Sequence, residues 1–94
     1  MIEKFLKALE ENKEIEMWYD NGAYKGDGFI IKRDGKYVYC YRHEAYTEPI
    51  KSLGNRRIKV SECDNCVEIE NIEKVKEIIE AWKNKNAEIR IKEK

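Results

Sequence analysis

The chain has 94 residues, and 40% of them are charged, with 19 basic and 19 acidic side chains and a formal net charge of zero. This length allows one domain with a small core, and no apolar run approaches the roughly 20 residues of a membrane span. The N-terminal stretch MIEKFLKALEENKE is acidic and lacks a signal-peptide pattern, so we expect a cytoplasmic protein. Abundant Lys and Glu are typical of hyperthermophile proteins, which favours a thermophilic archaeon, or its virus, as the source.

Charge is unevenly distributed along the chain. Residues 25–59 carry nine basic and four acidic side chains, a net charge of +5, whereas the segments before and after carry −3 and −2. This asymmetry predicts an anionic partner for the central segment. The alternative is a solvated sheet surface with interspersed charges.

The first half of the chain predicts one helix and three strands. Apolar residues at helical spacing predict a helix that starts at Ile2 and ends at Asn12 and Lys13. EIEMWYD, at 14–20, alternates as a strand does, and the Gly- and Asp-rich stretch that follows, up to residue 28, predicts a turn. FIIKR and KYVYCYR are short strands joined at Asp34-Gly35, a strong hairpin signal.

The second half of the chain begins with a segment whose sequence pattern is less regular than that of the first half. Residues 43–57 predict one irregular strand with an edge at Pro49 and a turn at Gly54–Asn55. RIKVSE predicts another strand, and CDNC predicts a tight turn after it. A second helix is expected from Asn71, which has the side chain of an N-cap, and AEIRIKE predicts a closing strand.

These elements predict a single domain of the α+β class over residues 1–94. We expect an antiparallel meander or small β-barrel with an N-terminal and a C-terminal helix.

Two matched pairs of metal-ligand residues stand in the chain. Cys40 and His43 are separated by two residues, as are Cys63 and Cys66, with nineteen residues between the pairs. Two ligands at this spacing can hold one ion from a single turn, and two such pairs complete a tetrahedral site. The pattern predicts a structural zinc ion held by these four residues.

Two other interpretations of the cysteines stay open at this point. Cys40 can be an ordinary buried thiol, because it alternates with three tyrosines and lies on the opposite face of its strand. Cys63 and Cys66 can form a disulfide, because intracellular proteins of hyperthermophiles are an exception to the rule that such bonds are extracellular.

Residues 2–61 resemble two families of small SH3-type barrels. IEMWYDNGAYKGDGFIIKRDGKYVY resembles the first motif of the Sm-like RNA-binding proteins through Gly22, Gly28 and Asp34, and LGNRRIKVSE resembles the second through Gly54. ALEENKEIEMWY and IIKRDGKYVYCY resemble the helix, first strand and hairpin of the WYL domain, a ligand-binding barrel of prokaryotic regulators. Both resemblances imply a barrel topology, but the uridine-reading residues of the Sm-like family are replaced here.

The central segment combines tyrosines with cations. Aromatic rings can stack on bases while Lys and Arg hold phosphates, so the segment predicts binding of single-stranded nucleic acid or a nucleotide. The candidate residues are Lys32, Arg33, Lys36, Tyr37, Tyr39, Tyr41, Arg42, Arg56 and Arg57. The alternative is that the tyrosine face of the strand belongs to the core.

No catalytic motif stands out in the sequence. The single histidine is better used as a ligand, and there is no phosphate-binding glycine loop, Ser/His/Asp set or HExxH motif. We therefore expect a non-enzymatic binding module. The alternative to nucleic-acid binding is a protein-interaction or inhibitor module that acts as a homodimer or through an aromatic face.

Overall fold

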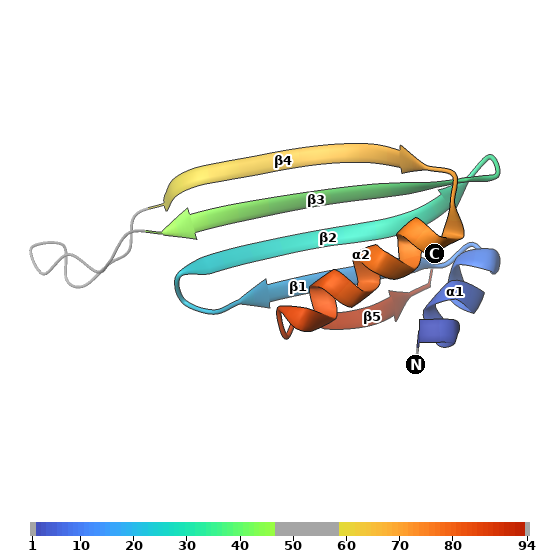
Figure 1. The fold of residues 1–94 in the computed structure, drawn as a ribbon, viewed down its shortest axis with the longest axis horizontal. Coiled ribbons are helices and arrows are strands. Elements are labelled where there is room, and N and C mark those ends of the chain that lie inside the picture. Colours follow the sequence, from blue (N-terminus) through green and yellow to red (C-terminus); the bar gives the residue numbers. More distant parts are fainter. Residues whose placement is uncertain (1, 47–58, 94) are drawn as a thin grey trace, which may run out of the picture.

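The computed structural model describes residues 2–46 and 59–93, which form two helices and five strands (Figure 1). In chain order these are α1 (Ile2–Glu10), β1 (Glu14–Asp20), β2 (Tyr24–Arg33), β3 (Lys36–Tyr46), β4 (Lys59–Ile69), α2 (Ile72–Asn84) and β5 (Glu88–Lys92). Neither of these helices combines the length and apolar character that a membrane crossing requires.

The strands form one antiparallel sheet with the order β4-β3-β2-β1-β5. The first four strands follow one another as a meander, and β5 returns to pair with β1 on its other side. The predicted α+β meander is therefore confirmed. β4 and β5 are the outer strands, and the described residues contain no pairing between them that would close the sheet into a barrel.

The hairpin between β2 and β3 turns at Asp34 and Gly35, as the sequence predicts. Both residues have a positive φ, 52° and 79°, which matches the twist of the flanking strands. The preceding connection is shorter than predicted. Asn21 Oδ1 accepts hydrogen bonds from the backbone of Ala23 and Tyr24, at 3.0 and 2.7 Å, so the turn is complete by residue 23.

The predicted turn over residues 20–28 is therefore wrong in its second half, where β2 begins at Tyr24. The predicted tight turn CDNC is also wrong, because residues 63–66 lie within β4 and pair with β3. In both cases a neighbouring strand supplies ladder hydrogen bonds to residues that favour turns by themselves. Residues 43–46 extend β3, and the rest of the predicted irregular strand, with Pro49 and Gly54–Asn55, lies outside the described residues.

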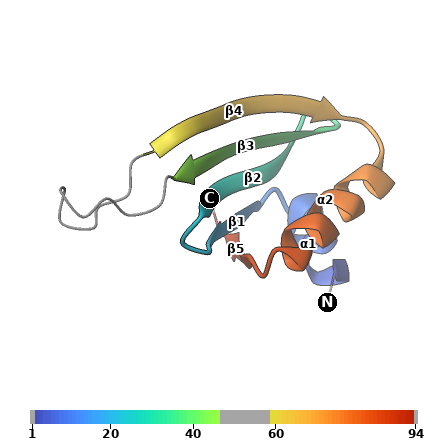
Figure 2. The same cartoon turned by 60° about the vertical axis from the view of Figure 1, so that its left-hand side comes forward.

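Both helices lie on the same side of the sheet, here called the covered face (Figure 2). The cross-strand register gives this face the side chains of Ile15, Met17, Ile30 and Tyr37, which pack with both helices into one core. The helices add apolar residues at helical spacing to that core: Phe5, Ala8, Leu9, Val75, Ile79 and Trp82. The N-cap of α2 is Asn71, as predicted, and its side chain accepts a hydrogen bond from Glu73 N at 2.8 Å.

A glycine in β2 sets how closely α2 approaches the sheet. Trp82 is only 2% exposed and lies against the backbone at Gly28. A Cβ atom at this position would lie 3.1 Å from Trp82 Cζ2 and 2.9 Å from the carbonyl oxygen of Cys40. The carbonyl belongs to the neighbouring strand and has little freedom to move, so only glycine fits beneath the indole.

We expect Gly28→Ala to destabilise the protein by about 1–3 kcal/mol, because the added methyl group overpacks the contact between Trp82 and the sheet. Urea denaturation followed by circular dichroism measures the change. Lys25→Ala in the same strand is the matched control, since Lys25 is exposed and its replacement should change stability by no more than about 0.5 kcal/mol. Equal stability of the two variants would contradict the proposed role of Gly28.

Candidate functional site

Most of the predicted site residues lie on β3, and the strand divides them between its two faces. Tyr37, Tyr39, Tyr41 and His43 alternate onto the covered face, as the contacts of their rings with the helices and β1 show. The residues between them belong to the opposite face, here called the open face: Lys36, Val38, Cys40 and Arg42. The predicted set is therefore not one surface.

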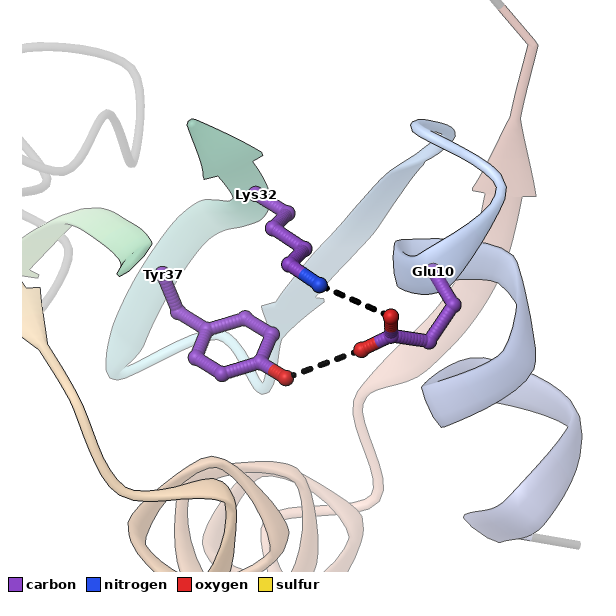
Figure 3. A network of polar contacts seen from close by, with 3 residues as sticks. All are labelled: Glu10, Lys32 and Tyr37. Carbon is purple, nitrogen blue, oxygen red and sulfur yellow. Dashed lines mark hydrogen bonds and ion pairs between the residues drawn. The ribbon is translucent and has the colours of Figure 1, made fainter. Parts of the chain in front are cut away.

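Two of the predicted nucleic-acid contacts instead attach α1 to the sheet (Figure 3). Lys32 Nζ donates to Glu10 Oε2 at 2.7 Å, and the hydroxyl of Tyr37 donates to Glu10 Oε1 at 3.1 Å. These two bonds hold the pKa of the Glu10 carboxyl below its usual value. Tyr37 is 7% exposed and belongs to the core, so the interpretation of the tyrosine face as core holds at this residue.

The other aromatic residues of the covered face form a chain of ring contacts. Trp82 Nε1 donates to the hydroxyl of Tyr39 at 2.8 Å, and the rings of Tyr39 and Tyr41 stack with centroids 4.9 Å apart. His43 stacks on Trp82 at 5.5 Å, and its Nδ1 shares a hydrogen bond of 3.1 Å with the hydroxyl of Tyr19. These tyrosines are half-buried, and their rings and hydroxyls already have partners within the fold.

His43 lies in a setting that disfavours its charged form. Partial burial lowers the pKa of the imidazole, the ammonium of Lys85 lowers it further, and Asp27 opposes both effects. Gly26, opposite His43 on β2, leaves room for the ring, because a Cβ atom there would lie 2.8 Å from His43 Nδ1. The neutral imidazole is therefore packed into the covered face as part of the structure.

The predicted basic residues do not gather into one patch within the described residues. Lys36 lies 3.6 Å from carboxylate oxygens of both Glu68 and Glu70. Arg33 is exposed at the end of the hairpin, and Arg42 is exposed on the open face. The remaining two cations of the set, Arg56 and Arg57, lie outside the described residues.

The four predicted zinc ligands lie opposite one another in two cross-strand pairs of β3 and β4. Cys40 pairs with Cys66, and His43 pairs with Cys63. Cys40 and Cys66 are joined by a disulfide, so the alternative of a Cys63–Cys66 bond is wrong. The described residues contain no group of three or more ligand side chains that could hold a metal ion. The zinc site stays a prediction, and it requires the two thiols that this disulfide consumes.

The open face as a whole was not among the sites predicted from the sequence. Cross-strand pairing places Trp18, Asp27 and Arg42 in one row, and Glu16, Phe29 and Cys40 in the next. The two rows border a shallow depression of about 470 Å³. The alternation of EIEMWYD was a usable signal, because it separates Glu16 and Trp18 from the buried Ile15 and Met17.

Comparison with known proteins found no family model, no curated protein and no solved structure that matches this chain. The resemblance to Sm-like and WYL barrels stays a prediction.

The lowered pKa of His43 predicts a loss of stability in acid. The unfolded chain, with an ordinary histidine pKa of 6.5, binds the proton before the folded protein does. The free energy of unfolding should therefore fall as the pH is lowered from about 7.5 to 5.5, and the fall is complete below the folded-state pKa. His43→Gln should reduce this dependence, because the chain has no other histidine. Urea denaturation at each pH measures the free energy of unfolding. If this free energy depends on pH in the same way in His43→Gln and in the unchanged protein, His43 is not the source of the acid sensitivity.

The disulfide between β3 and β4 predicts two measurable properties. The intact mass of the unreduced protein should be two hydrogens lower than that of the reduced protein. Reduction should destabilise the fold by about 3 kcal/mol, since the bond closes a loop between residues 26 apart in sequence. Cys63→Ser should keep the mass difference and Cys40→Ser should lose it. Alkylation of all three cysteines without reductant would contradict the bond, and one zinc per chain in that protein would support the metal prediction.

Proposed function

We propose that this protein is a non-enzymatic binding module that engages a protein partner through its open face. One observation carries the proposal. The face lies opposite both helices, and it combines aromatic and aliphatic side chains with charges of both signs.

The apolar part of the open face is separate from the core. Ile31 is 6% exposed but does not belong to the core cluster on the covered face. Val38 lies opposite Ile31 on β3, and Phe29 precedes Ile31 by two residues on β2. Trp18 lies further along the same face, opposite Asp27, and the side chains of Trp18, Phe29 and Val38 are half-buried without a helix over them. Surfaces that combine aromatic and aliphatic groups with a polar rim are typical of protein interfaces.

The charges of the open face favour a protein over a phosphate backbone. Nucleic-acid binding relies on an excess of cations that replace counterions. Here acidic and basic side chains are mixed on one face, and β2 and β5 each carry both signs. The acids are Glu14, Glu16, Asp27, Glu68 and Glu88, and the bases are Arg33, Lys36, Arg42, Arg90 and Lys92. Glu16 binds Arg90 at 2.9 Å and Lys92 at 3.5 Å, so several of these cations are already neutralised within the protein.

Binding of single-stranded nucleic acid or a nucleotide is the second candidate. It is favoured by the net charge of +5 over residues 25–59 and by the tyrosines of β3. A homodimer through the open face is a form of the first candidate, because the partner is then a second copy of the chain.

Other parts of the proposal rest on the sequence alone. These are closure of the sheet into a small barrel, a structural zinc ion in the reduced protein, and a cytoplasmic location in a thermophilic archaeon or its virus.

Site-specific photo-crosslinking tests the proposal. We expect benzoylphenylalanine in place of Val38, on the open face, to form a discrete protein adduct in a lysate of the source cells. The same group in place of Glu80, an exposed residue of α2, is the control and should not form it. The adduct should resist nuclease, and an adduct of twice the chain mass identifies a homodimer. Adducts formed equally at both positions, or only nuclease-sensitive adducts, would contradict a protein partner on this face.

A further inference from the structure

The depression on the open face has an acidic and aromatic lining. It is bordered by the rings of Trp18 and Phe29 and by three acidic residues, Glu14, Glu16 and Asp27, with Arg42 as its single base. Asp27 is a short side chain between Trp18 and Arg42 in the cross-strand row, which leaves a hollow between two long neighbours. The depression is therefore open to solvent and carries more negative than positive charge.

Among the described residues, two of these carboxylates have no bound cation. Asp27 is exposed and Glu14 is half-buried, and neither has an ion-pair partner within 4.0 Å in the described parts of the chain. Glu16, in contrast, holds both Arg90 and Lys92. A ligand that enters the depression meets two carboxylates that can still accept a charge-assisted hydrogen bond.

The protein itself shows how this indole binds a cation. The guanidinium carbon of Arg90 lies 4.9 Å from the centroid of the Trp18 ring, and Arg90 Nε donates to Glu16 Oε2 at 2.9 Å. The combination of an aromatic face and a carboxylate is the usual environment for a bound guanidinium or ammonium group. Arg90 comes from β5, on one side of β1, whereas Asp27 and Phe29 come from β2 on the other side.

We infer that the depression receives an arginine or lysine side chain from a basic segment of the protein partner. The cation would contact the rings of Trp18 and Phe29 and bind the carboxylate of Asp27, so that the β2 side of Trp18 repeats the arrangement that Arg90 and Glu16 form on the β5 side. Charge complementarity argues for this occupant, because an acidic or phosphorylated segment would meet Glu14 and Asp27 at the same place. The inference rests on the proposed function, since it names the chemistry of the partner.

A peptide titration followed by ¹⁵N NMR tests the inference. The probe is an acetylated peptide of alternating arginine and serine, and the control probe has glutamate in place of arginine. We expect the arginine peptide alone to shift the indole resonance of Trp18 and the amides of Asp27 and Phe29 in a saturable way. Asp27→Asn and Trp18→Leu should each weaken binding about tenfold, because each removes one half of the cation site.

Glu88→Gln is the matched control variant. Glu88 is an exposed acid opposite Trp18 on β5, and its replacement changes the net charge as Asp27→Asn does, but it does not line the depression. Equal weakening by Glu88→Gln and Asp27→Asn would overturn the inference, as would shifts caused by an oligothymidine probe and not by the peptide. If the peptide does not bind but a protein adduct forms at Val38, the inference is overturned and the proposed function stands. If neither the peptide binding nor the adduct is observed, the proposed function is overturned as well.

Discussion

The contact between Trp82 and the glycine-bearing part of β2 is the constraint on which the arrangement of the fold depends. An indole placed directly on a strand brings α2 close to the sheet, and its Nε1 then reaches the hydroxyl of Tyr39. Gly26 in the same strand also lacks a side chain, and this leaves room for the rings of Tyr19 and His43 beside Trp82. The helices thus occupy one side of the sheet, and no helix of the described residues lies over the opposite face, which makes that face the candidate binding surface.

The two faces of the sheet consequently have different roles. On the covered face, polar atoms of aromatic residues bind one another or a carboxylate, as Tyr37 binds Glu10. These bonds orient α1 and α2 while satisfying groups that burial would otherwise penalise. On the open face, apolar and charged side chains lie at the surface, and the disulfide between Cys40 and Cys66 joins β3 to β4 on this same face. A rigid sheet is a good support for recognition, because its side chains have fixed spacings.

The cysteines show why spacing in sequence was a weak guide. Two residues separated by two others lie on one side of a turn, but on a strand they lie on opposite faces. The zinc prediction assumed knuckles at both pairs, whereas both pairs lie in extended strands. The register between β3 and β4 then brings Cys40 to Cys66 and His43 to Cys63. This pairing depends on two segments far apart in the chain, and no local pattern contains it.

The sequence by itself determined the local elements whose signals agree with their surroundings. Periodicity located α1, α2 and β1, Asp34-Gly35 defined the hairpin, and Asn71 began α2, because each depends only on neighbouring residues. Only the tertiary structure decided which face of β3 is covered, that CDNC is a strand, and that Trp18 borders a depression beside Asp27. Those outcomes depend on what packs on the sheet and on strand register, and both are set by contacts between distant segments.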